Sequence, residues 1–157
     1  EGITYRTATL ADHATTLELM TELMRDLDPN DDAEKTRQLL DPDFKIALTA
    51  DNIEVFIAED QGYPIGLGRA DVLTEDPIFR LRPDQRCGYV DQMFVRAAYR
   101  CKNIGAQLLR LCEDWFREQG IKQCVLHAAP KAIRFYARHA YLPNREMYKD
   151  IIPPETP

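Results

Sequence analysis

Residues 88–127 constrain the fold more than any other part of the sequence. Gly88 to Val95 has the composition of a β-strand, and Lys122 to His127 reads as a second one. Between them, apolar residues recur at helical spacing: Ile104, Leu108, Leu111, Cys112, Trp115 and Phe116. A helix that joins two strands of one sheet predicts a parallel pair connected by a right-handed crossover.

The first half of the chain predicts antiparallel pairing instead. Val55 to Ala58 and Pro64 to Val72 read as strands, and the turn Asp60-Gln61-Gly62-Tyr63 predicts that they form a hairpin. Before the hairpin we expect a strand over Ile3 to Ala8. A helix over Ala11 to Leu27 should follow, with a capping box at Thr9 to Asp12. A shorter helix is expected over Ala33 to Leu40 and should end before Asp41-Pro42.

The chain as a whole is predicted to be one domain over residues 1–157, of the α/β (α+β) class. Its sheet is mixed and mostly antiparallel, with helices flanking it. The expected later elements are a long charged connection over Leu73 to Arg86, a short helix from Pro130 through Tyr136, and a last strand over Met147 to Ile152. Long connections in compact domains are often functional.

Composition excludes several classes of protein. The formal net charge is −6 and no Lys/Arg-rich run is present, which argues against nucleic-acid binding. No apolar run approaches the roughly 18 residues that a membrane span needs, and no signal peptide is visible, so we expect a cytoplasmic protein. The four cysteines (Cys87, Cys101, Cys112 and Cys124) contain no CxxC pair, so they are interpreted as isolated thiols and we expect no metal site.

The segment from Tyr89 to Leu109 runs from a strand through a loop into the start of a helix. The first N–H groups of a helix have no intrahelical partner, and with the positive end of the helix dipole they bind phosphate anions. Arg100 and Lys102 add positive charge to the same loop. The segment therefore predicts a pyrophosphate site, although many basic loops of this kind bind nothing.

This loop resembles the acyl-CoA loop of the GCN5-related N-acetyltransferase (GNAT) superfamily, whose pattern is Arg/Gln-x-x-Gly-x-Gly/Ala. Arg100 fills the first position, Asn103 stands where Gly is usual, and Gly105 fills the last. A second block, Ala132 to Tyr141, is similar to the family pattern A-x-x-F-Y-x-x-x-G-F. The resemblance covers the whole chain in element order.

The resemblance implies a GNAT-like fold, with a splayed parallel strand pair, and acetyl-CoA (or another acyl-CoA) as co-substrate. The backbone of the strand from Gln92 to Val95, including Met93 and Phe94, would hold the acyl-pantetheine arm. Backbone N–H groups of the loop would bind the pyrophosphate: Arg100, Cys101, Lys102, Asn103, Ile104, Gly105 and Ala106. Tyr136 would protonate the leaving thiolate, its alternative role being a core tyrosine. Homodimers are common in the family, so we expect one here.

Asp91 is the candidate for the group that takes a proton from the acceptor ammonium. It lies in an otherwise apolar strand, where an unpaired carboxylate is costly, and similar enzymes often have an acid here. The alternatives are that Asp91 faces solvent or pairs with Arg86 or Arg96. His127 is interpreted as a structural histidine. The acidic run Asp26, Asp28, Asp31, Asp32 and Glu34, with the connection 73–86, is expected to flank the acceptor.

Three positions depart from the family pattern. Cys101 and Asn103 stand in the loop where glycine is common, and Ala140 replaces a glycine near a helix end, where a left-handed residue is expected. Two hypotheses follow. The first is an N-acyltransferase that moves an acetyl or other acyl group to the primary amine of a small cationic molecule or a lysine-containing peptide. The second is a weakened module of the same fold that binds CoA or a protein without turnover.

Overall fold

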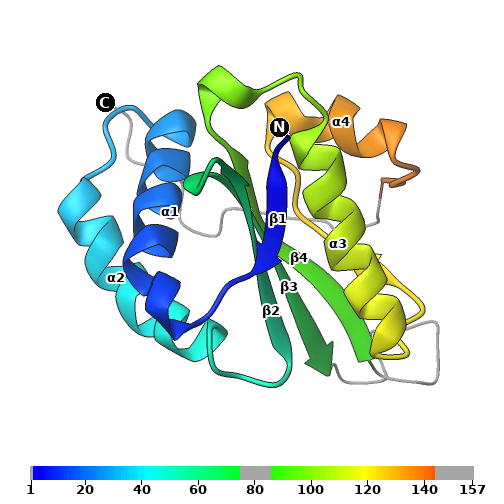
Figure 1. The fold of residues 1–157 in the computed structure, drawn as a ribbon. Helices are drawn as coiled ribbons and strands as arrows, with labels where there is room; N and C mark the ends of the chain where they lie inside the picture. Colours follow the sequence, from blue (N-terminus) through cyan, green and yellow to red (C-terminus); the bar gives the residue numbers. More distant parts are fainter. Residues whose placement is uncertain (1, 75–85, 144–157) are drawn as a thin grey trace, which may run out of the picture. The chain divides into compact units, whose positions relative to one another are not determined.

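The computed structural model describes residues 2–74 and 86–143, which belong to two compact units, 1–127 and 128–157. The first unit contains a five-stranded sheet and three long helices (Figure 1). Its elements are β1 (Thr4–Thr7), η1 (Leu10–Asp12), α1 (His13–Leu27), α2 (Ala33–Ala47), β2 (Ile53–Asp60), β3 (Tyr63–Thr74), β4 (Arg86–Val95), η3 (Ala97–Tyr99), α3 (Ile104–Glu118) and β5 (Cys124–Val125). The described part of the second unit contains η4 (Pro130–Ala132) and α4 (Ile133–Arg138).

The strands of the sheet follow chain order, β1-β2-β3-β4-β5. The first three neighbouring pairs are antiparallel, and β4 and β5 are parallel with α3 as their crossover. The hairpin of β2 and β3 turns at Gln61 and Gly62, both with positive φ. This mixed and mostly antiparallel sheet confirms the predicted fold class.

Helices cover both faces of the sheet in the first unit (Figure 1). On one face α1 and α2 enclose a core that includes Leu19, Met20 and Phe44 from the helices and Ile57 and Leu67 from the strands. On the other face α3 lies close to the strands, and a Cβ added at Gly88 would come within 2.9 Å of the Phe116 ring and of the Cys124 Cβ. Glycine therefore allows α3 to pack at the junction of the parallel pair.

Helix α2 corrects one sequence prediction, because it continues through Pro42 to Ala47 instead of ending at Leu40. Proline removes one helical hydrogen bond and costs about 3 kcal/mol inside a helix. The last turns of α2 bury Phe44 and Ala47 completely or nearly so against the sheet, and this burial offsets the cost. Tertiary packing thus overrides the local signal of the Asp41-Pro42 pair.

Strand β5 is a second correction, since only Cys124 and Val125 form the strand predicted over Lys122 to His127. These residues pair with Gly88 and Tyr89, after which the described part of β4 has no partner on that side. The connection predicted over residues 73–86 loses residues at both ends to the neighbouring strands, because β3 extends to Thr74 and β4 begins at Arg86. The strand predicted over residues 147–152 lies outside the described residues.

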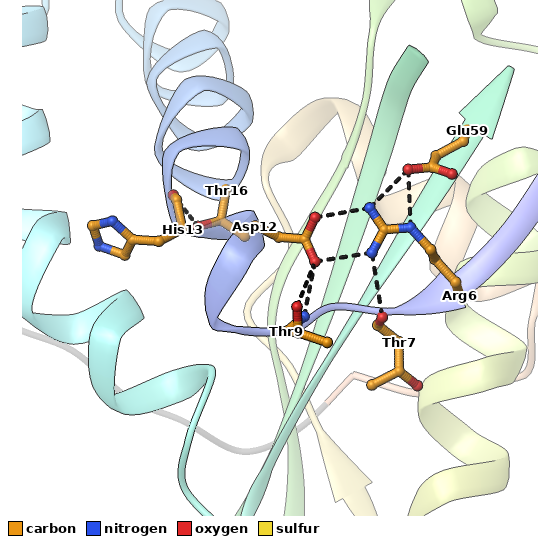
Figure 2. A network of polar contacts seen from close by, with 7 residues as sticks. All are labelled: Arg6, Thr7, Thr9, Asp12, His13, Thr16 and Glu59. Carbon is orange, nitrogen blue, oxygen red and sulfur yellow. Dashed lines mark hydrogen bonds and ion pairs between the residues drawn. The ribbon is translucent and has the colours of Figure 1, made fainter. Parts of the chain in front are cut away.

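The N-terminal strand is fixed to the rest of the unit by Arg6 (Figure 2). Its guanidinium binds the Asp12 carboxylate of η1 at 2.8 and 2.9 Å and Glu59 of β2 at 2.8 and 2.9 Å. The Thr9 N–H also donates to Asp12 at 2.8 Å, which is the acidic half of the predicted capping box. One arginine therefore joins β1, β2 and the start of α1.

Candidate functional site

Strand β4 has a free backbone edge beyond its short pairing with β5. β4 pairs with β3 along its length, whereas within the described residues its β5 pairing is limited to Gly88 and Tyr89. Phe94 is buried in the core beneath α1 and α2, and Met93 packs beside Gly68 on the α3 side of the sheet. Apart from the Val95 carbonyl oxygen, which accepts from Arg100, backbone groups on the open edge from Val90 to Val95 are placed to bind an extended, amide-containing chain.

The loop between β4 and α3 turns through two left-handed residues. Cys101 has φ +63° and Asn103 has φ +64°, which explains why glycine suits both positions. The first hydrogen bond of α3 runs from Gln107 N to the Asn103 carbonyl oxygen at 3.1 Å. The N–H groups of Ile104, Gly105 and Ala106 precede this bond, and such groups at a helix start bind anions. The backbone conformation therefore fits a pyrophosphate.

The basic side chains of this loop are engaged within the protein. The Arg100 guanidinium binds Asp26 of α1 and donates to the Val95 carbonyl oxygen at 2.9 Å. The Lys102 ammonium lies 5.3 Å from the centre of the Tyr99 ring. Arg100 thus holds the loop against α1, and the donors that remain for an anion come mainly from the backbone.

The acidic run after α1 has structural partners as well. Asp32 caps α2 by accepting from the N–H groups of Glu34 and Lys35 at 3.1 and 3.2 Å. Asp31 accepts from the Thr36 hydroxyl at 2.7 Å, and Asp28 accepts from the Asn30 N–H at 2.9 Å. These contacts give structural roles to three of the carboxylates that were predicted to flank the acceptor.

Asp91 occupies a β-bulge in β4. In the register with β3, Arg69 lies opposite Gln92 and Ala70 lies opposite Val90, so Asp91 is an extra residue without a partner position. Bulges redirect a side chain and are frequent beside active sites. The irregularity therefore places one carboxylate on the polar end of the sheet face that α2 covers.

The partner of Asp91 is Arg69 of β3, and not Arg86 or Arg96. Arg69 Nη2 lies 3.5 Å from Asp91 Oδ2. The same guanidinium binds Asp71 through two hydrogen bonds of 2.8 and 2.9 Å and binds Asp43 of α2 at 2.5 Å. We call Asp43, Arg69, Asp71 and Asp91 the carboxylate cluster. It brings three carboxylates from three elements to one buried cation.

The carboxylate cluster alters the ionisation of Asp91. Burial, followed by the charge of Asp71 and a hydrogen bond with Asp71, raises the Asp91 pKa from 3.8 to about 6, against the opposing effect of Arg69. The side chain keeps 29% of its surface exposed, so it can still exchange protons with a bound molecule. A carboxylate in this state can accept a proton near neutral pH.

The arginines proposed as alternative partners of Asp91 are used elsewhere. Arg86 donates to the Gln119 carbonyl oxygen at 3.0 Å. Arg96 binds Glu18 and Glu22 of α1 at 2.5 and 2.8 Å and lies 4.6 Å from the centre of the Tyr63 ring. Arg96 therefore attaches α1 to the end of β4.

Tyr136 lies in α4 of the second unit. It is 9% exposed and packs edge to face against Phe135 and Tyr141, with ring centres 5.1 and 5.7 Å apart. The helix ends at Arg138 with His139 as its C-cap, and the next residue, Ala140, has a φ of +65°, the left-handed conformation predicted there. N–H groups of Ala140 and Tyr141 bond back to the Ala137 and Tyr136 carbonyl oxygens at 3.2 and 3.1 Å, which forms a Schellman motif.

His127 has a partner just beyond the parallel strand pair. The Tyr89 hydroxyl and His127 Nδ1 are 2.7 Å apart, and the two rings lie 5.6 Å apart. Because Tyr89 is the last β4 residue paired with β5 in the described chain, the contact continues the junction through side chains. This agrees with the interpretation of His127 as a structural residue.

Arg69, Asp71 and Asp43 were not predicted as site residues from the sequence. The signal for the first two was present, because Arg69 and Asp71 are two charges at alternate positions of the otherwise apolar strand Ile65 to Val72. Alternate residues of a strand share a face, so their opposite charges predict a pair. Asp43 gave no such signal, since it follows Pro42 where the helix was expected to have ended.

Two further properties concern residues 2–74 and 86–143. No group of three or more His, Cys, Asp or Glu side chains in these ranges is arranged to hold a metal ion. Nor does any helix in them have the length and apolar character that crossing a membrane requires.

Comparison with a family model identifies most of the chain. The model of the acetyltransferase (GNAT) family matches residues 17–141. The match includes the carboxylate cluster, the loop that precedes α3, and the helix α4. No curated protein sequence matches the chain significantly.

Solved structures with the same fold include proteins of this family. A GCN5-related N-acetyltransferase from Ralstonia eutropha JMP134 has 25% identity and a TM-score of 0.82, with 96% of this chain and 99% of the other covered. A predicted acetyltransferase with acetyl-CoA from Clostridium acetobutylicum has 18% identity and a TM-score of 0.81, with 94% and 95% covered. An aminoglycoside N-acetyltransferase in complex with CoA has 19% identity and a TM-score of 0.65, with 98% and 95% covered.

Proposed function

The chain belongs to the GNAT family of acetyltransferases, and from this premise we propose that it transfers an acetyl group from acetyl-CoA to a primary amine. The observation that carries the proposal is the placement of Asp91 in the β4 bulge, with its pKa raised to about 6 by burial and by Asp71. A carboxylate of this pKa is half or more ionised at neutral pH and takes a proton from an ammonium more readily than an ordinary aspartate does.

Acetyl-CoA fits the features that precede and follow the bulge. The free edge of β4 offers backbone partners for the amides of the pantetheine arm. The N–H groups of Ile104, Gly105 and Ala106, at the start of a 15-residue helix, offer donors to the pyrophosphate. The likeness to structures solved with acetyl-CoA and with CoA agrees with this co-substrate.

The reaction proposed is a direct displacement at the thioester. Asp91 takes a proton from the acceptor ammonium, directly or through water, and the neutral amine attacks the thioester carbonyl carbon. The C–S bond breaks as the C–N bond forms, the nitrogen releases its second proton to water, and the thiolate leaves as CoA thiol after protonation. Tyr136 is the proposed donor of that proton because of its position in the block Ala132 to Tyr141.

The proposed acceptor is a cationic amine, as a small molecule or a lysine-containing peptide. Fully ionised, the carboxylate cluster carries three negative charges against one positive charge, and it attracts a cation to the proton acceptor. One solved structure with this fold is an aminoglycoside N-acetyltransferase, and aminoglycosides are among the acceptors to be tried.

The proposal is tested in two stages on the full chain. Calorimetric titration with acetyl-CoA, beside CoA alone, is expected to show saturable binding at micromolar strength. Release of CoA thiol is then followed with a panel of aminoglycosides, polyamines and lysine peptides. Binding with amine-dependent thiol release supports the proposal, and absence of acetyl-CoA binding at millimolar concentration overturns it.

A non-catalytic module gives a different result in the same experiment. Such a module binds CoA and acetyl-CoA without releasing thiol in the presence of any amine of the panel. Tyr136→Phe separates the proposed acid from a core tyrosine, because the variant keeps the ring and loses the hydroxyl. We expect a loss of kcat with little change in thermal stability, whereas a purely structural Tyr136 leaves kcat unchanged.

A further inference from the structure

Resting on the proposed function, the geometry points to Arg69 and Asp71 as positioning residues, which orient the Asp91 carboxyl in its bulge and set how readily it takes a proton. Neither side chain is expected to touch the acetyl group or the acceptor nitrogen. Arg69 is 3% exposed and Asp71 is 6% exposed, so both lie beneath the surface that a substrate can reach. They act on the reaction only through Asp91.

The orientation of the Asp91 carboxyl is fixed through Arg69. Arg69 donates from Nε and Nη2 to the two oxygens of Asp71 at 2.8 and 2.9 Å, a planar and bidentate arrangement. The same Nη2 then lies 3.5 Å from Asp91 Oδ2. Because Arg69 and Asp71 are two residues apart on β3, the strand itself holds the pair in register with β4.

The third side of the guanidinium faces α2. Arg69 Nη1 binds Asp43 Oδ2 at 2.5 Å, and the guanidinium carbon lies 5.3 Å from the centre of the Phe44 ring. Phe44 is fully buried in the core beneath α1 and α2. Arg69 is therefore held from three sides and cannot follow a movement of Asp91, which is what a positioning group requires.

The charges that face Asp91 act in opposite directions. Asp71 from β3 and Asp43 from α2 repel its negative charge, and a hydrogen bond with Asp71 also favours the protonated carboxyl. Arg69 favours the ionised form. Among the described residues, the same strand also carries the titratable Tyr89, whose hydroxyl contacts His127 Nδ1 at 2.7 Å. The protonation of Asp91 thus depends on a balance between one cation and two carboxylates.

The balance between Arg69 and the two carboxylates suits both the uptake and the release of a proton by Asp91. The ionised Asp91 accepts the ammonium proton through Oδ1 or Oδ2, and the amine keeps the electron pair that forms the C–N bond. Once Asp91 is protonated, its hydroxyl can donate to the Asp71 carboxylate, which favours the protonated form, and Asp91 returns the proton to water before the next cycle. The pair needs no other reactant than the ammonium and water.

Two substitutions are expected to move the ionisation of Asp91 in opposite directions. Asp71→Asn removes a negative charge, so the rise of kcat/KM with pH moves about one pH unit lower. Arg69→Gln removes the positive charge, so the rise moves about one pH unit higher. Arg69→Lys restores the charge without the bidentate fork and is expected to return most of the shift. Asp114→Asn, in an exposed pair with Arg117 on α3, is the matched control.

A second readout needs no turnover. Protein labelled with ¹³C at aspartate side chains is titrated by NMR, with the Asp91 signal assigned by its absence in Asp91→Asn. Opposite displacements of the Asp91 titration in Asp71→Asn and Arg69→Gln support the inference, and unchanged titration in both overturns it. If Arg69→Gln does not fold, Asp71→Asn and Arg69→Lys decide, because the first still lowers the midpoint and the second leaves it near the wild-type value.

The two readouts separate this inference from the proposed function. Wild-type protein that releases no thiol with any amine overturns the function, while the NMR titration still tests the influence of Arg69 and Asp71 on Asp91. Conversely, an active enzyme whose Asp91 titrates alike in all variants retains the function and loses the inference.

Discussion

The carboxylate cluster and the loop before α3 use different parts of the chain for their chemistry. In the cluster the side chains carry the charge, and the register between β3 and β4 is regular except for the bulge at Asp91. In the loop the backbone offers the donors, and two residues adopt a left-handed conformation to aim them. Proton transfer at the cluster should therefore depend on which side chains are present. Anion binding by the loop should depend instead on backbone freedom and on added bulk.

The arginines of the two regions should differ most in their contribution to stability. Arg69→Met leaves three carboxylates around an uncharged side chain, and we expect a loss of about 3 kcal/mol in the free energy of unfolding. Arg100→Met removes a guanidinium whose side chain is 47% exposed, and a loss below about 1 kcal/mol is expected. Urea unfolding followed by circular dichroism measures both, and equal losses would remove this difference between the regions.

The two regions should also separate in catalysis. Asp91→Asn removes the proton acceptor, and we expect kcat to fall about 100-fold with unchanged affinity for acetyl-CoA. Gly105→Glu places a negative charge at the anion-binding turn, and we expect acetyl-CoA to bind at least about tenfold more weakly. Thiol-release kinetics and calorimetry give the two values.

Gly105→Ala is the matched control, because the family pattern accepts alanine at this position. It should bind acetyl-CoA about as well as the wild type does. If Asp91→Asn instead impairs acetyl-CoA binding as strongly as Gly105→Glu, the cluster and the loop form one binding surface and the division between them is wrong.

The raised pKa of Asp91 makes the cluster a source of instability at neutral pH. Its pKa is about 6 in the folded protein against 3.8 for the free group, so the folded state resists the ionisation that the unfolded state accepts. Asp91→Asn is therefore expected to stabilise the protein by about 1 kcal/mol above pH 6. The gain should disappear as pH falls from about 6 to about 4, where the carboxyl is protonated in both states.

Thermal unfolding of the wild type and Asp91→Asn across this pH range measures the effect. A difference in stability that stays constant with pH contradicts the raised pKa. No corresponding pH dependence is expected for Cys101→Gly, whose effect arises in the backbone.

The left-handed backbone strain at Cys101 should have the smallest effect on the free energy of unfolding, and this effect should be purely conformational. Cys101 has φ +63° and a side chain that disfavours it, so Cys101→Gly is expected to raise the free energy of unfolding by about 0.5–1 kcal/mol. Cys101→Ser retains a β-carbon and should leave stability unchanged. Chemical denaturation measures both, and a stabilising serine would point to the thiol instead of the backbone.

The loop conformation was predictable because the family pattern has glycine where the backbone adopts a positive φ. Cys101, Asn103 and Ala140 were singled out as departures from glycine, and all three have positive φ in the structure. The hairpin of β2 and β3 and the parallel pair were predicted from hydrophobic periodicity and turn residues, and both are confirmed. Local conformation depends mainly on residues that are near one another in the sequence, which is why the left-handed positions and the strand pairs could be predicted.

The cluster was only partly predictable because its contacts cross between distant elements. The strand position of Asp91 was visible, but its bulge depends on the register with β3. Its partner Arg69 is 22 positions earlier in the sequence, and Asp43 lies on a helix that continues through Pro42 only because Phe44 and Ala47 are buried. Such pairings depend on packing, which a single sequence does not display.

The chain order of the strands also has a consequence for how the protein folds. The hairpin of β2 and β3 closes over two residues, whereas β1 reaches β2 only after α1 and α2. Short-range pairings form earliest, within about 1–10 μs for a hairpin, and the parallel pair must wait for the crossover of α3. Arg69 and Asp71, two residues apart on β3, are therefore expected to be in place on the hairpin before β4 adds Asp91, so that this carboxylate meets its counter-ion as it becomes buried.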